Sequence, residues 1–203
     1  MSKIQCPRCG SDKKAKILYV KEEYVNKEIH ENNDEIYISH EIPESGSSVG
    51  KYHCNECGFN FGGNSAGMRK TVRRVMVSVE YDEKRRRDCI FLRTEDGRYF
   101  NYISEEPSFG NSGNVSMTQE SWKKFVKSVF SCYIMDWGYK YGKDENVYPK
   151  WSVKVEFYGE HANLKEREDF KEFGGIRICG AGEYPVYWKK FKKVIEKYSG
   201  EML

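Results

Sequence analysis

Apolar and polar positions alternate along several stretches of the C-terminal two thirds of the chain. Val75, Val77, Val79 and Tyr81 occupy one side of such a stretch, which predicts a strand with one buried face. Short runs rich in β-branched and aromatic residues predict further strands at residues 90–93, 99–102, 151–158 and 176–179. Asp96-Gly97 lies between the first two of these runs and is typical of a tight hairpin turn. We therefore expect an antiparallel sheet.

Two other stretches have the three- and four-residue spacing of amphipathic helices. The first covers residues 118–137, begins with a capping-box pattern at 116–119 and follows a predicted long loop at 105–115. The second covers residues 185–198 and has a proline in its first turn, where the missing N–H costs little. Such helices bury their apolar stripe on a sheet, so residues 71–203 predict a small α+β domain with two main helices on one face.

The N-terminal region contains two Cys-x-x-Cys pairs. The pairs are Cys6 with Cys9 and Cys54 with Cys57, and a glycine follows each pair directly. Two such pairs supply four soft thiolates, which is the ligand set of a closed, tetrahedral structural zinc site. The glycines suit the left-handed backbone of tight turns that aim both sulfurs of a pair at one ion. We therefore predict one structural Zn²⁺ ion and no open catalytic position.

These cysteine pairs also resemble the zinc ribbon family. The resemblance rests on Cys-Pro-x-Cys-Gly-Ser at residues 6–11 and on aromatic-x-Cys-x-x-Cys-Gly at residues 52–58. It implies two zinc knuckles joined by a small β-sheet, in a protein that contacts DNA, RNA or other proteins. Between the pairs, residues 15–25 and 35–42 predict two strands, which form either an extended hairpin or a third ribbon strand. His53 is an alternative metal ligand beside the second pair.

Glycine, serine and asparagine mark the boundary between the two regions. Residues 62–67 have the composition of a flexible linker. We therefore divide the chain into a zinc ribbon with a long β-hairpin insertion at 1–63, a linker at 64–70 and an α+β domain at 71–203.

Composition and charge indicate a folded protein but do not identify its partner. Aromatic residues make up 15% of the chain, and a disordered protein would lack them, so we expect a folded core. Lys and Arg number 34 against 31 Asp and Glu, and the resulting net charge of +3 indicates no partner by itself. The sequence has neither an apolar run of membrane-spanning length nor a signal-peptide core, so we expect a cytoplasmic protein. Cys89, Cys132 and Cys179 are then expected to be free thiols.

Local clusters of basic residues give the main indication of function. The clustered residues are Arg69, Lys70, Arg73, Arg74, Arg85, Arg86 and Arg87. Lys and Arg bind phosphates without a fixed motif, so these residues are candidates for nucleic-acid contacts, although a solvated surface has the same composition. We therefore predict a non-catalytic accessory or regulatory protein that binds nucleic acid through the ribbon and the neighbouring basic turns.

Two other functions are open alternatives. One is an adaptor that docks on a protein partner through ribbon aromatics such as Phe59 and Phe61. The other is a metal-dependent hydrolase whose carboxylates converge only in the fold, because no motif identifies a reaction. Gly180-Ala181-Gly182 precedes a predicted helix but lacks the spacing of a phosphate-binding loop. The segment from Trp151 to the Tyr-Pro-x-x-Trp-x-x-Phe helix resembles a module of uncharacterised bacterial proteins, which implies no activity.

Overall fold

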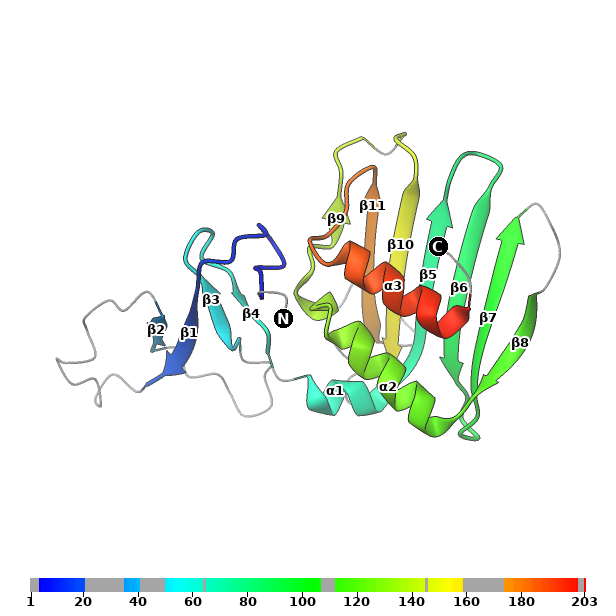
Figure 1. The fold of residues 1–203 in the computed structure, drawn as a ribbon, viewed down its shortest axis with the longest axis horizontal. Helices are drawn as coiled ribbons and strands as arrows, with labels where there is room; N and C mark the ends of the chain where they lie inside the picture. Colours follow the sequence, from blue (N-terminus) through cyan, green and yellow to red (C-terminus); the bar gives the residue numbers. More distant parts are fainter. Residues whose placement is uncertain are drawn as a thin grey trace. The chain divides into compact units, whose positions relative to one another are not determined.

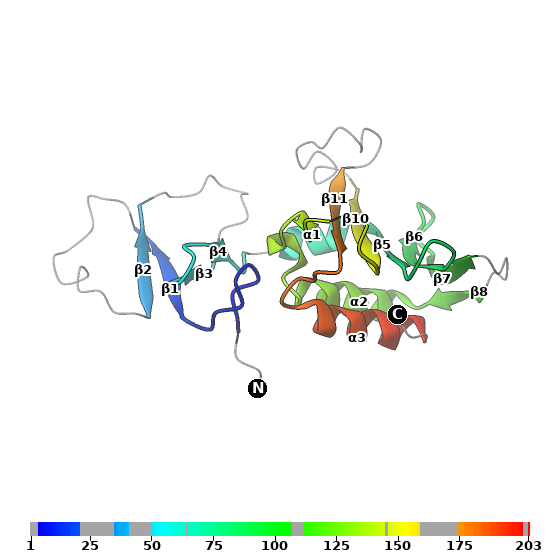
Figure 2. The ribbon, with the colours of Figure 1, turned by 90° about the horizontal axis from the view of Figure 1, so that it is seen from above.

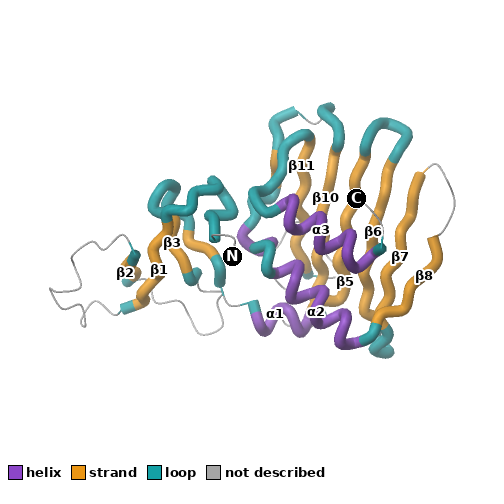
Figure 3. The backbone as a smooth tube through the Cα atoms, viewed as in Figure 1, coloured by secondary structure: helices purple, strands orange, loops and turns teal. Residues whose placement is uncertain are grey.

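The computed structural model describes residues 4–20, 35–40, 50–63, 65–106, 112–144, 146–158, 174–200 and 203. The chain folds as two compact units, Met1–Ser65 and Ala66–Leu203 (Figure 1). Each unit contains its own β-sheet, and the described helices belong to the second unit (Figure 3). None of these described helices is long and apolar enough to cross a membrane. The fold class is therefore α+β, as expected.

The first unit contains a four-stranded sheet in the order β2-β1-β3-β4. Its strands are β1 (Lys14–Tyr19), β2 (Ile36–Ser39), β3 (Tyr52–Cys54) and β4 (Asn60–Phe61). β1 pairs antiparallel with β3 but parallel with β2. The expected strands at 15–25 and 35–42 are therefore present in part, and residues 21–25 and 41–42 lie outside the described residues. The hairpin alternative is wrong, because the two strands of a hairpin run antiparallel. β2 is instead an additional strand at one edge of this sheet.

The second unit is organised around a seven-stranded sheet in the order β8-β7-β6-β5-β10-β11-β9 (Figure 1). Its strands are β5 (Val72–Glu80), β6 (Arg86–Arg93), β7 (Tyr99–Glu106), β8 (Ser112–Met117), β9 (Lys140–Tyr141), β10 (Lys150–Phe157) and β11 (Gly175–Ala181). Neighbours run antiparallel except β9 and β11, which are parallel. β5 to β8 form a meander, after which the chain returns to place β10 beside β5.

Two helices, α2 (Gln119–Phe130) and α3 (Trp188–Ser199), cover one face of this sheet (Figure 2). α1 (Ala66–Thr71) precedes β5, and the 3-10 helix η3 (Ile134–Asp136) follows α2. The hydroxyl oxygen of Thr118 accepts a hydrogen bond from the N–H of Ser121 at 3.1 Å and caps α2. α2 is shorter than the predicted helix, because Tyr133 takes a left-handed backbone with φ of 56° that interrupts the helical course.

The core of the second unit lies between the sheet and these two helices. Val77 of β5 and Val153 of β10 are directly paired and fully buried. The rings of Phe91 in β6 and Phe125 in α2 stack with centroids 4.1 Å apart. Because alternate residues of a strand point to opposite faces, the burial of the odd-numbered valines fixes which side chains lie on the other face. The strand predicted from their alternation is confirmed.

Three stretches of the second unit differ from the predictions. Part of the expected loop at 105–115 belongs to the end of β7 and to β8, and residues 107–111 lie outside the described residues. β8 has few apolar residues and is held by backbone pairing with β7. The two-residue strand β9 is too short to give a sequence signal. Residues 66–70, expected in a linker, belong to α1, and Met68 of that helix is buried in the core. The two units meet after Ser65, which lies inside the expected linker, but the second unit begins with α1 and not at residue 71.

A buried carboxylate lies on the sheet face opposite the helices. The side chain of Glu156 in β10 is only 1% exposed. Its Oε1 lies 2.5 Å from Nη2 of Arg74 and 2.7 Å from Nζ of Lys154. Burial opposes ionisation of this carboxyl, but hydrogen bonds from the two cations outweigh it and lower the pKa of Glu156. The carboxylate therefore links β5 to β10 by charge as well as by backbone pairing.

We predict that Glu156→Gln lowers the free energy of unfolding at neutral pH by about 1–3 kcal/mol, because Arg74 and Lys154 lose their buried counter-charge. The folded pKa lies below the ordinary value of 4.5. The carboxylate therefore stabilises the fold above that value, and its contribution is lost as the pH falls through the folded pKa. Urea unfolding between neutral and acid pH should show the difference between variant and wild type shrinking.

Glu120→Gln is the control for this comparison. Glu120 is 76% exposed and pairs with Lys124 on the surface of α2. Exposed pairs of this kind contribute less than about 0.5 kcal/mol, so this variant should be almost as stable as the wild type. Equal losses in the two variants would contradict a special role for the buried carboxylate.

We also predict that the second unit folds by itself when the chain begins at Ala66. A fragment that begins at Thr71 should be less stable by about 2 kcal/mol or more, because it lacks the buried side chain of Met68. Thermal unfolding of the two fragments, followed by circular dichroism, measures the difference. Equal midpoints would show that α1 belongs to the linker after all.

Candidate metal site and basic sheet face

The four cysteines of the first unit meet at one point. Their Sγ atoms lie within 4.8 Å of one another, with Cys6 3.7 Å from Cys57 and Cys9 3.5 Å from Cys54. A tetrahedral ion with metal–sulfur bonds of about 2.3 Å separates its ligands by about 3.8 Å, so the group fits a single ion. In the described parts of the chain, it is the one group of three or more Cys, His, Asp or Glu side chains close enough to share a metal ion.

Each cysteine pair is held in a turn of the same shape. The N–H of Gly10 donates to the carbonyl of Cys6, and the N–H of Gly58 donates to the carbonyl of Cys54, both at 2.9 Å. Both glycines have positive φ, 80° and 72°, where other residues would be strained. The glycine after each pair is therefore a structural part of the site, and it has the role that the sequence predicts.

Burial divides the four thiols into two kinds. Cys6 and Cys54 are buried, whereas Cys9 and Cys57 are exposed. Burial raises the pKa of Cys6 to about 12. At Cys54 burial acts in the same direction, but the backbone N–H groups of Cys57 and Glu56 outweigh it and lower the pKa to about 7. Because ligands bind metal as thiolates, a bound cation would displace the proton of Cys6 and compensate for its burial.

Contacts between the two turns support this arrangement. The guanidinium of Arg8 lies 4.0 Å from the ring centroid of Phe59, and Nζ of Lys13 lies 2.5 Å from the carboxylate of Glu56. Phe61 is fully buried. Phe61 is therefore not available to the adaptor surface of the alternative function, whereas Phe59 is half-buried with Arg8 over its ring.

His53, the alternative ligand, takes part in the sheet of the first unit. Its ring stacks on that of Tyr37 with centroids 3.7 Å apart, and its Nδ1 lies 2.7 Å from Oδ1 of Asn60. It is not among the four side chains that converge. Among the described residues of this unit, the large apolar side chains that are exposed are Leu18, Ile36 and Tyr37.

No described helix covers the sheet face opposite α2 and α3 (Figure 2). This face carries many charged side chains. Strand alternation and register place basic residues on this face over β5, β6, β9, β10 and β11. They are Arg74, Arg86, Lys140, Lys150, Lys154 and Arg177. The acidic residues of the same strands on this face are Glu80, Asp88 and Glu156. We call this surface the basic sheet face.

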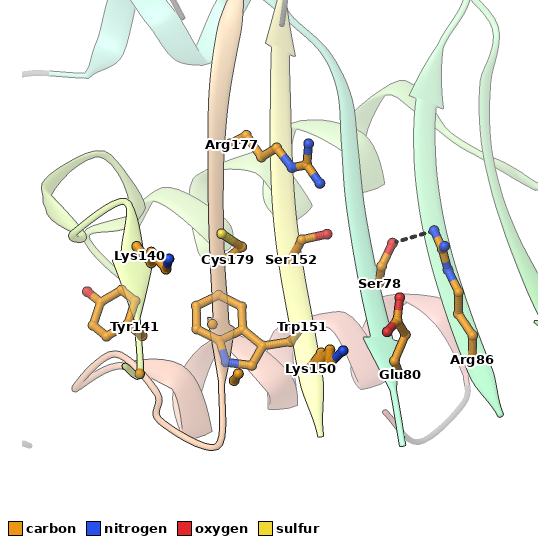
Figure 4. A pocket seen from close by; sticks show the side chains of 13 residues that line it. Ser78, Glu80, Arg86, Lys140, Tyr141, Lys150, Trp151, Ser152, Arg177 and Cys179 are labelled. Atoms are coloured by element: carbon orange, nitrogen blue, oxygen red, sulfur yellow. Dashed lines mark hydrogen bonds between the residues drawn. The ribbon is translucent and has the colours of Figure 1, made fainter. Parts of the chain in front are cut away.

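A pocket of about 360 Å³ lies on the basic sheet face (Figure 4). Its cationic residues come from four strands and are Arg86, Lys140, Lys150 and Arg177. Ser78 and Ser152 are cross-strand neighbours in its floor, and the hydroxyl oxygen of Ser78 accepts a hydrogen bond from Arg86 at 3.4 Å. Figure 4 shows the guanidinium of Arg177 extending across β10. The one acidic side chain in the lining is Glu80, so the pocket is suited to an anion with several oxygen atoms.

The structure separates the basic residues that the sequence singles out. Residues 69–70 lie in the last turn of α1, whereas Arg85 to Arg87 lie at the other end of β5 (Figure 1). A strand of nine residues is about 30 Å long, so the two clusters do not form a single patch. Arg86 is the member of this set that lines the pocket.

Several of these residues already have partners within the protein. Arg74 binds the buried Glu156, and Nε of Arg85 lies 2.6 Å from the carboxylate of Asp82. The guanidinium of Arg73 lies 5.6 Å from the ring centroid of Tyr158. Intramolecular pairing therefore weakens the case for these residues as the main phosphate contacts.

Sequence reasoning missed the other cations of the pocket. Lys140, Lys150 and Arg177 are single basic residues, and none of them belongs to a basic cluster. One signal was present: Lys150, Ser152 and Lys154 alternate with the apolar residues of β10, so they had to lie opposite the core. The cations come together because β10 lies between β5 and β11. No short sequence pattern predicts this strand order.

No family model matches the chain. Comparisons with curated proteins and with solved structures also return no significant match. The resemblance to zinc ribbons therefore rests on the cysteine motifs, and what the structure adds is four thiols spaced for a single metal ion.

We predict about one tightly bound metal ion per chain, because four thiolates complete a tetrahedral site. Cys6→Ser should lose the ion and unfold the first unit, because metal binding supplies much of the folding free energy of such small modules. Metal analysis and native mass spectrometry measure the ion, and amide exchange reports on the fold. Cys179→Ser is the control, since this half-buried cysteine lies outside the group. A folded first unit in metal-free protein would contradict the prediction.

Proposed function

We propose that this is a non-catalytic, zinc-stabilised protein that binds nucleic acid on the basic sheet face. The observation that carries the proposal is the gathering of four cations from four strands around one pocket. Phosphate groups are bound by such side chains without any fixed motif, and the strength of binding increases with the number of phosphates contacted. The proposal thus moves the main contact surface from the predicted basic turns to the sheet.

The distribution of ion pairs supports an external anion at this pocket. Asp88 pairs with Arg86 at 3.0 Å, and Glu156 pairs with Arg74 and Lys154. Among the described residues, neither Lys150 nor Arg177 has a carboxylate partner. The charges of Lys150 and Arg177 are therefore not neutralised by these pairs. They attract polyanions, most strongly at low ionic strength.

Zinc is the metal that we propose for the four cysteines. Soft thiolates in tetrahedral spacing favour zinc over magnesium or calcium, which prefer oxygen ligands. With four protein ligands the site has no open position for a substrate, so the role of the ion is to hold the fold of the first unit. Residues Lys14 and Lys16 of β1 add positive charge to that unit.

We predict that the protein binds nucleic acid with an affinity that falls steeply as the salt concentration rises. Replacing both Lys150 and Arg177 by Ala should weaken binding at least about tenfold. The same replacement should reduce the salt slope by about one for each phosphate group that the variant no longer neutralises. Fluorescence anisotropy with labelled oligonucleotides measures both quantities.

Lys189→Ala with Lys193→Ala is the matched control, because it removes the same charge from exposed positions of α3, on the other side of the sheet. This variant should keep its affinity. Equal losses in the two variants would show that only net charge matters. If the wild type ignores DNA and RNA even at low salt, the proposal fails, and the adaptor function with a protein partner becomes the hypothesis to test.

A further inference from the structure

The cations of the pocket lie around a row of short side chains that crosses the sheet. In this row Ser78 of β5, Ser152 of β10 and Cys179 of β11 are directly opposite one another. Lys140 of β9 continues the row at one end, because it pairs with the cysteine. Ser78 is only 6% exposed, so its hydroxyl belongs to the floor of the pocket. Because serine and cysteine side chains are short, the row leaves room for a ligand between the longer cations.

The other cations approach this floor from its remaining sides. Lys150 lies two positions before the serine of β10, and Arg177 lies two positions before the cysteine of β11. Because the two strands are antiparallel, these two residues lie on opposite sides of the row. Figure 4 shows the guanidinium of Arg177 extending across β10, and Nη2 of Arg86 donates a hydrogen bond to the hydroxyl of Ser78 from β6. Positive charge therefore surrounds the floor.

The pocket carries more positive charge than one phosphodiester group neutralises. Its lining contains four cations and one carboxylate, that of Glu80. Asp88 pairs with Arg86 at 3.0 Å and offsets one further positive charge. Among the described residues, four cations less these two carboxylates leave an excess of two positive charges. A phosphate group inside a strand carries one negative charge, whereas a phosphate group at the end of a strand carries nearly two at neutral pH.

The arrangement of the donors also matches a terminal phosphate group. Such a group presents three oxygen atoms that accept hydrogen bonds, and a guanidinium binds such oxygens as a planar fork. A phosphate group inside a strand has two of its four oxygens esterified, so the chain must leave the pocket in two directions past the surrounding cations. The end of a strand leaves in only one direction.

We infer that the pocket on the basic sheet face binds the phosphorylated end of a nucleic-acid strand. This inference rests on the proposed function and adds the part of the strand that the pocket recognises. The terminal phosphate group lies over the two serines, between the guanidinium groups of Arg86 and Arg177, and the strand leads away from the pocket. Phosphate groups farther along the strand then add affinity without any preference for an end.

Fluorescence anisotropy at low salt with one single-stranded oligonucleotide, prepared in four forms, tests the inference. The forms carry a 5′-phosphate, a 3′-phosphate or hydroxyl groups at both ends, or are closed into a circle, and the dye is attached to an internal base. The wild type should bind one phosphorylated form at least about tenfold more tightly than the hydroxyl form, because the additional charge and oxygen atom strengthen the charge-assisted hydrogen bonds. The circle should bind no more tightly than the hydroxyl form.

Arg177→Ala should remove this preference. Arg177 is exposed, so its replacement leaves no cavity in the core, and circular dichroism checks that the fold is kept. The preference for the phosphorylated form should fall from about tenfold towards none, while the affinity for the hydroxyl form falls by a smaller factor. The control Lys189→Ala with Lys193→Ala, on α3, should keep the preference of the wild type.

The four forms separate this inference from the proposed function. Equal affinity of the wild type for phosphorylated and hydroxyl forms would overturn end recognition and leave the proposed function standing. An undiminished preference in folded Arg177→Ala protein would also overturn it, because the end would then be bound outside the pocket. Failure to bind any of the four forms, even at low salt, would overturn both.

Discussion

The antiparallel pairing of β5 with β10 determines both faces of the second unit. The register that sets Val77 opposite Val153 buries the valines of both strands against α2 and α3. A shift of one residue in β10 would turn its valines away from the helices and bring serine and lysine into the core. Full burial of a valine contributes about 1.5–3 kcal/mol, more than an exposed ion pair, so the core decides the register.

The positions of the charged residues follow from that register. Once the valines face the helices, Lys150, Ser152 and Lys154 must face the other way, beside Glu80, Ser78 and Met76 of β5. The buried Glu156 joins the same two strands through Arg74 and Lys154. Most of the strands that carry the pocket cations are therefore held by the core on the other face of the sheet. Such support keeps charges in a fixed geometry, which favours binding by lowering the entropy cost.

The two units reach stability by different means. The first unit buries few apolar side chains among its described residues, which are Ala15, Ile17 and Phe61 beside Cys6 and Cys54. Units this small rarely bury enough apolar surface to fold alone. A metal ion bound by four thiolates would supply the missing folding free energy. The second unit has a continuous core that includes aromatic residues of both helices and the strands.

The sequence by itself determined the features that depend on short-range pattern. The spacing of the cysteine pairs and their glycines indicated the metal ligands, and alternation and helical periodicity indicated β5, β10, α2 and α3. Tertiary structure alone decided which strands are neighbours, because pairing between distant strands depends on the packing of the whole core. That pairing made β2 parallel to β1, buried Phe61, and gave Arg74 an acidic partner on β10. It also brought Lys140, Lys150 and Arg177 together from three strands, which no local pattern could show, since each is a single charge in its own segment.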